Sequence, residues 1–199
     1  MKKATLAICA IFLGSYSAVA DDCRERVVFL VMDSMKVRPS EGHLISEVTG
    51  QPKTENLFIA ADLDHTLYKS ISPANQPWTL TYKGAMYQSS DEGKSWKKVH
   101  SFDSEKQRAA IIASVTEQAK SATNAVCGEE ELDGVMHDTF EADFSVSKPT
   151  KMDMHNKYWR NRETGFVTKS TSRVKVTGAE SFTTQTWKFL DKVELPIPD

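Results

Sequence analysis

Residues 78–88, WTLTYKGAMYQ, decide the fold class of this chain. Apolar Trp78, Leu80 and Tyr82 alternate with polar residues at a period of two, which is typical of a half-buried strand. Gly84 follows, and a second strand begins around Met86, so the stretch predicts a β-hairpin. Because hairpins join antiparallel neighbours, the sequence favours an antiparallel sheet over a parallel one.

The segments on both sides of this hairpin have the same character. Residues 44–48 and 57–61 are predicted strands, separated by the turn residues Gly50-Gln51-Pro52. Residues 166–177 and 181–190 are rich in Thr, Val, Phe and Trp and predict two more. Counting the shorter alternating segments, we expect about seven to nine strands.

Two segments have helical patterns instead. Residues 24–35 place apolar residues at i, i+3 and i+4, and residues 104–122 lack Gly and Pro and are rich in Ala, Glu, Gln and Lys. Ser101 or Asp103 is the expected N-cap of the second helix, and Cys127-Gly128 is its expected exit. The chain is therefore predicted to be an α+β protein with one curved antiparallel sheet and two principal helices.

The first twenty residues have the three-part layout of a secretory signal peptide. A basic Lys2-Lys3 start precedes an apolar run over residues 4–13, and Ala18-Val19-Ala20 forms a small-x-small cleavage site. We therefore expect residues 1–20 to be removed and residues 21–199 to form a single domain. With 40% hydrophobic residues and a net charge of −2, the chain is typical of a soluble globular protein and ill suited to nucleic acid.

Two cysteines, Cys23 and Cys127, stay after cleavage, since Cys9 leaves with the leader. An even number of cysteines in an exported chain favours one disulfide, with two separate buried thiols as the alternative. Neither Cys9 nor Cys23 has a lipobox, because Ile8 and Asp22 precede them where a small residue is required. We expect a periplasmic protein that is neither lipid-anchored nor an integral membrane protein.

An apolar segment ending in Asp-x-Asp-x-Thr occurs at residues 57–67, LFIAADLDHTL. It resembles the first motif of haloacid-dehalogenase-like phosphatases, which implies Asp62 as nucleophile, Asp64 as acid/base and a bound magnesium ion. That fold is parallel and needs a helix after this strand, whereas Pro73, Pro77 and a hairpin follow here. We expect no enzymatic activity, and a phosphatase using Asp62 and Asp64 is the catalytic alternative.

No other pattern in the sequence indicates catalysis. Residues 89–96, SSDEGKSW, match the Asp-box hairpin, in which Asp and Gly shape a turn and Trp packs beneath it. The histidines and cysteines have no paired spacing for a metal, and the sequence has no glycine-rich loop for a phosphate. We therefore predict neither a metal nor a cofactor.

Several local phrases resemble the LolA/LolB-like superfamily of periplasmic lipid and lipoprotein carriers. They are the opening helix, then Gly84-x-x-Tyr87 leading to Gly93-x-x-Trp96, and residues 159–166, WRNRETGF. The last looks like that family's Trp-x-Asp-x-x-Thr-Gly-Leu-Pro hairpin, although Asn161, Phe166 and Val167 depart from it. No arginine of this chain matches the arginine that such carriers tend to use inside the cavity.

The resemblance implies an unclosed half-barrel curled over the helices, with an apolar cavity for acyl chains. The expected function is that of a non-enzymatic binding protein for an amphiphilic or lipid-like ligand, such as a lipid or a lipidated chain. An envelope protein–protein interaction module without a small ligand is the alternative. The candidate lining residues are large and apolar, and each could instead simply fill the core: Phe58, Trp78, Leu80, Tyr82, Met86, Phe140, Phe144, Met152, Met154 and Trp187.

Overall fold

The computed structural model describes residues 16–147 and 150–198, so residues 1–15 of the expected signal peptide lie outside the described residues. The described residues form two helices and one eleven-stranded sheet. The helices are α1 (Tyr16–Asp33) and α2 (Ser104–Lys120). The strands are β1 (Ser40–Val48), β2 (Thr54–Asp62), β3 (His65–Ser72), β4 (Trp78–Tyr82), β5 (Ala85–Ser89), β6 (Lys97–Ser101), β7 (Thr123–Leu132), β8 (Val135–Val146), β9 (Met152–Asn161), β10 (Val167–Val176) and β11 (Ala179–Phe189).

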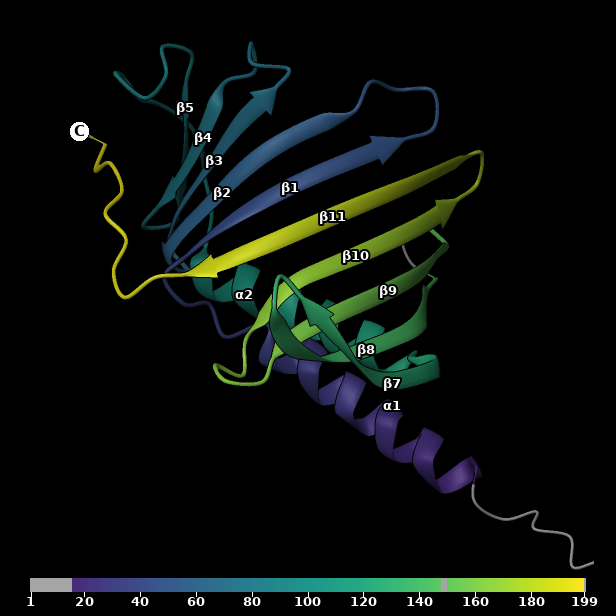
Figure 1. Cartoon of the computed structure of the whole chain (residues 1–199). Coiled ribbons are helices and arrows are strands. Elements are labelled where there is room, and N and C mark those ends of the chain that lie inside the picture. The colour runs from purple at the N-terminus through teal and green to yellow at the C-terminus, as the bar shows by residue number, and fades with distance from the viewer. Residues whose placement is uncertain (1–15, 148–149, 199) are drawn as a thin grey trace, which may run out of the picture.

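The sheet is a curved, open half-barrel in which every pair of neighbouring strands is antiparallel (Figure 1). Its order is β6-β5-β4-β3-β2-β1-β11-β10-β9-β8-β7, so the first and last strands of the chain pair at its centre. The α+β half-barrel prediction is confirmed. The predicted number of strands, about seven to nine, is lower than the eleven observed, chiefly because β6 and β7 lack clear apolar alternation.

The hairpin predicted over residues 78–88 is present. β4 and β5 pair from Trp78–Ser89 to Tyr82–Ala85, and the two-residue turn between them has positive φ at both positions, 46° at Lys83 and 70° at Gly84. Two consecutive left-handed residues give the turn the twist of the flanking strands.

The helices also follow the sequence, except at their ends. Asp103 is the N-cap of α2, and its carboxylate accepts a hydrogen bond from the backbone N–H of Lys106 at 3.0 Å. α1 extends further toward the N-terminus than expected, so Cys23 lies inside it. Cys127 lies within β7 and is not the exit of α2, because the chain already leaves the helix at Ser121. Neither helix in the described part is long and apolar enough to cross a membrane.

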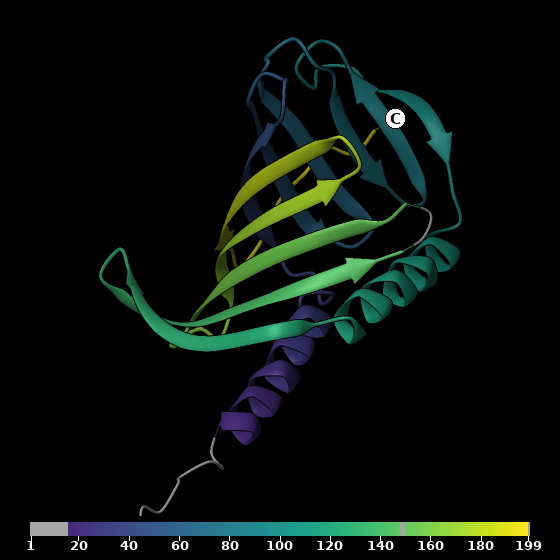
Figure 2. The ribbon, with the colours of Figure 1, turned by 90° about the vertical axis from the view of Figure 1, so that its right-hand side faces the viewer.

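The predicted disulfide is present, with a Cα–Cα distance of 5.7 Å between Cys23 and Cys127. It joins α1 to the edge strand β7, at one end of the inner face of the sheet. Around it, Val27 and Leu30 of α1 pack with Phe140 and other buried residues of β8 and α2. Figure 2 shows both helices at this end of the half-barrel, and the central strands are left without a helical cover.

Candidate functional site

Three central strands line up small and aromatic residues on the inner face of the sheet. Residues that pair directly across neighbouring antiparallel strands lie on the same face. Gly42 of β1 pairs with Trp187 of β11 on one side and with Phe58 of β2 on the other. The Phe58 and Trp187 rings meet edge to face, with centroids 6.0 Å apart.

Gly42 is what allows the indole of Trp187 to lie against the sheet. A Cβ atom at position 42 would lie 2.3 Å from Cζ3 of Trp187, which is an impossible contact. Gly42 therefore leaves a space on strand β1, called here the indole seat, that the ring of Trp187 occupies.

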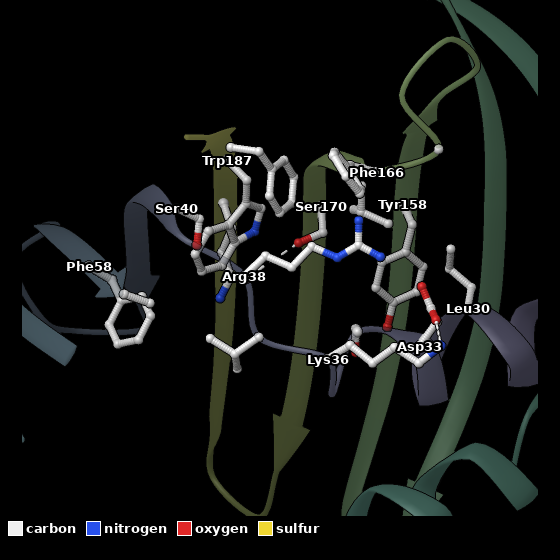
Figure 3. Close-up of a pocket in the computed structure, with 17 residues that line it drawn as sticks. Leu30, Asp33, Lys36, Arg38, Ser40, Phe58, Tyr158, Phe166, Ser170 and Trp187 are labelled. Carbon is white, nitrogen blue, oxygen red and sulfur yellow. Dashed lines mark hydrogen bonds and ion pairs between the residues drawn. The ribbon is translucent and has the colours of Figure 1, made fainter. Parts of the chain in front are cut away.

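A cavity of about 310 Å³ opens beside this seat, between the inner face and the end of α1 (Figure 3). This volume is at the lower end of the roughly 300–1,000 Å³ typical of small-molecule sites. Its walls come from α1, the segment after α1, and strands β1, β2, β9, β10 and β11. The side chains that line it are mostly apolar or aromatic and include Leu30, Val37, Phe58, Ala60, Tyr158, Phe166, Val167, Trp187 and Phe189.

The turn before β10 positions one of these rings. The side chain of Asn161 accepts hydrogen bonds from the backbone N–H groups of Glu163 and Thr164, at 2.8 and 3.0 Å. Gly165, with a φ of 72°, then directs the chain back so that the N–H of Asn161 bonds to the carbonyl of Phe166 at 2.8 Å. Phe166 packs on Phe189, with ring centroids 4.3 Å apart.

Two cations stand at the opening of the cavity. Arg38 extends toward Phe166, and its guanidinium carbon lies 4.3 Å from the centroid of that ring (Figure 3). No hydrogen bond or ion pair of the Arg38 side chain occurs among residues 16–147 and 150–198. Lys36, in contrast, is paired with Asp33 at 2.6 Å.

Tyr158 supplies a polar group to the wall of the cavity. Its phenol oxygen accepts a hydrogen bond from the side-chain amide of Asn156 at 3.0 Å, which leaves the phenol proton free to be donated. Burial raises the pKa of Tyr158, so the phenol stays neutral at physiological pH.

The ten candidate residues from the sequence separate into three groups. Phe58 and Trp187 line the cavity. The strand pairing puts five more on the same inner face but outside the cavity lining: Phe140, Phe144, Met154, Met86 and Met152. Phe140 and Phe144 are buried beneath the helices, and Met154 packs against that core.

The third group, Trp78, Leu80 and Tyr82, lies on the outer face. Ile59 follows Phe58 in β2 and therefore points to the outer face. It pairs with Leu67 of β3, which pairs with Leu80 of β4, so Leu80 lies on the outer face as well. Leu80 is fully buried there. The C-terminal tail reaches this face, where the His65 ring is hydrogen bonded to the carbonyl of Pro196 at 2.9 Å. Leu67, which pairs with Leu80, is buried on this face as well, away from the cavity.

Sequence reasoning missed Arg38, Tyr158, Phe166 and Phe189. Tyr158 could have been found, since it alternates in phase with Met152 and Met154 along one strand. Arg38 gave no signal, because it lies in the irregular segment between α1 and β1, where no periodicity fixes the direction of a side chain.

The Asp62–Asp64 motif forms the turn of an antiparallel hairpin between β2 and β3. The backbone N–H of Asp64 donates to the Asp62 carboxylate at 2.8 Å, as in an Asx turn. This arrangement contradicts the parallel strand end that the phosphatase alternative requires. Among the residues described, no three His, Cys, Asp or Glu side chains group in a way that could hold a metal ion.

Comparison with known proteins gives structural likenesses only. No family model matches the sequence, and no curated protein matches it significantly. Among solved structures, the chain is similar to a LolA superfamily protein from Nitrosomonas europaea, at 7% identity and a TM-score of 0.35, over 89% of this chain and 94% of that one.

Two further solved structures are similar. The complex of MucA and MucB from Pseudomonas aeruginosa matches at 12% identity and a TM-score of 0.41, over 80% of this chain and 57% of that one. The hypothetical lipoprotein YmcC from Escherichia coli matches at 10% identity and a TM-score of 0.35, over 74% and 86%. These TM-scores are low, and we base no functional inference on them.

Proposed function

We propose that this protein is a non-enzymatic periplasmic binding protein for an amphiphilic, lipid-like molecule. The observation that carries the proposal is the inner cavity, which lies between the end of α1 and the central strands and is lined largely by aromatic and aliphatic side chains. Open apolar surface of this kind is costly in water, so a site that keeps it is suited to an apolar ligand.

The composition of the cavity favours an amphiphile over a purely apolar ligand. Phe58, Trp187 and Phe189 offer surface to a hydrocarbon chain, whereas Arg38 stands at the opening, where a polar end would emerge. Burying an acyl chain gains roughly 0.8 kcal/mol per methylene group. A chain of moderate length therefore supplies enough free energy for specific binding.

Export to the periplasm is supported by two features of the chain. The Cys23–Cys127 bond is of a kind that persists in oxidising compartments. The layout of residues 1–20 is that of a cleavable leader.

A second candidate function is the docking of an envelope protein. It is favoured by apolar side chains that both helices expose: Phe29 of α1 is 64% exposed, and Ile111 and Ile112 of α2 are 46% and 42% exposed. Large apolar side chains that stay exposed to solvent are found at protein–protein contacts.

Extraction of the purified protein with organic solvent, followed by mass spectrometry, tests the proposal. We expect one amphiphile per chain. The variant Ser170→Phe, which puts a ring into the cavity wall, should release it. The matched variant Thr186→Phe, an exposed position on the outer face of the neighbouring strand, should retain it. A clean extract with a co-purifying polypeptide would instead favour the second candidate, and a clean extract alone would contradict the proposal.

A further inference from the structure

A second, outer cavity adjoins the inner one where β11 ends. Its volume is about 570 Å³, and it is bounded by the segment after α1, the turn before β10 and the end of β11. The two cavities share four lining residues, Arg38, Phe166, Trp187 and Phe189. The stacked pair of Arg38 and Phe166 is thus part of the wall between them.

The two cavities differ in the side chains that they do not share. Leu30, Val37 and Phe58 line only the inner cavity. Thr164, Lys188 and Asp191 line only the outer one and bring hydroxyl and charged groups. Both linings are mixed, because Asp33 and Lys36 also line the inner cavity, where they pair with each other, and Pro39 and Leu190 also line the outer one. The feature that marks a polar end is therefore Arg38, which lines both cavities and has no ion-pair partner among the described residues.

The charges at the boundary favour an anion. Arg38, Lys188 and Asp191 are the charged residues that line the outer cavity, and none of the three takes part in an ion pair among the described residues. Lys188 lies opposite Glu41 in the strand register, on the other face of the sheet from Trp187, so Arg38 is the cation on the side of the aromatic residues. The guanidinium carbon of Arg38 lies over the Phe166 ring, and the N–H donors of the group have no hydrogen-bond or ion-pair partner among the described residues, so they stay available. A planar fork of donors of this kind matches a carboxylate or a phosphate.

We propose that Arg38, where the two cavities meet, is the head-group subsite for an anionic amphiphile and binds its carboxylate or phosphate while the hydrocarbon chain occupies the inner cavity. This inference rests on the proposed function and adds the charge of the ligand to it. Arg38 then has two roles, since its stem closes the apolar chamber and its guanidinium holds the head.

Calorimetric titration with a set of probes that share one chain tests the subsite. The probes are dodecanoate, dodecyl phosphate, dodecanol and dodecylamine, each below its micellar concentration. We expect the two anions to bind about tenfold more tightly than dodecanol, the magnitude of one charge-assisted contact, and dodecylamine to bind most weakly. The variant Arg38→Gln should abolish this preference for the anions over dodecanol.

Arg173→Gln is the matched control. Arg173 also lies over a phenylalanine, 5.6 Å from the Phe182 ring, but it pairs with Glu180 and lines neither cavity. This variant should bind all four probes like the parent protein. Lys188→Gln should weaken the anions by less than Arg38→Gln, because Lys188 lines only the outer cavity.

The outcomes separate the subsite from the proposed function. Equal binding of dodecanol and dodecanoate, or equal losses for all probes in Arg38→Gln, would overturn the anionic subsite and leave amphiphile binding intact. Binding of no probe would overturn both. If inorganic phosphate bound as tightly as dodecyl phosphate and lost this binding in Arg38→Gln, that result would support the anion site and contradict amphiphile binding.

Discussion

At the scale of single residues, small differences in side-chain size decide where the cavity lies. Gly42 leaves room for the indole of Trp187, and Phe166, where the resembling hairpins have leucine, provides the ring on which Arg38 rests. Neither effect follows from hydrophobic periodicity, because a glycine in a strand and a residue in a turn both interrupt the pattern.

The variant Gly42→Ala should therefore destabilise the protein. The added methyl group would displace the indole of Trp187, and overpacking of this kind costs about 1–3 kcal/mol. Urea denaturation followed by circular dichroism measures the change. Glu41→Ala, an exposed position on the opposite face of the same strand, should stay within about 0.5 kcal/mol of the parent. Equal stability of the parent and Gly42→Ala would show that the indole does not occupy this seat.

Asp91 makes the hairpin after β5 sensitive to acid. Hydrogen bonds donated by Ser95 and Ser89 hold the pKa of the Asp91 carboxyl well below its usual range. Because the pKa of Asp91 is lower in the folded state than in the unfolded state, the carboxylate stabilises the fold at a pH above its unfolded pKa. This stabilisation is lost as the pH falls through the folded-state pKa. Stability measured from about pH 6 to about pH 2 should thus fall less steeply in Asp91→Asn than in the parent. Identical pH profiles would contradict this role.

At the scale of elements, the disulfide fixes α1 to the sheet edge. Cys23 and Cys127 are 104 residues apart, and the bond lies beside the core formed by α1, α2 and β8. The cysteine count predicted the bond, but the helical and strand positions of its two ends could not be read from local patterns. Strand β7 is mostly polar and follows α2 at once, so its sequence gives little sign of a strand.

Replacing both cysteines by alanine should lower the free energy of unfolding by about 2–5 kcal/mol, since the long loop of the unfolded chain is released. The double variant should still fold, because eleven paired strands and the inner core persist. Thermal and urea denaturation of the double variant, beside the parent with and without reductant, measure the change. A parent protein that is unaffected by full reduction would contradict the structural role of the bond.

At the scale of the whole molecule, the sequence was informative about architecture and much less so about the site. Period-two alternation and turn residues predicted the antiparallel sheet, and helix composition predicted α1 and α2. The face of the sheet on which each side chain lies was harder to predict. Trp78, Leu80 and Tyr82 are as apolar as Phe58 but lie on the outer face of the sheet. Only the pairing register tells the two faces apart, and register is set by contacts between distant segments.

The central claim is that the inner cavity holds the apolar chain of an amphiphile beside Trp187. The most direct test is quenching of tryptophan fluorescence by a fatty acid that is brominated near the end of its chain. We predict saturable quenching in the parent protein, loss of most of it in Trp187→Phe, and no loss in Trp96→Phe, whose ring packs near Gly93 in the β5–β6 turn. Quenching that is absent, or that survives unchanged in Trp187→Phe, would contradict the claim.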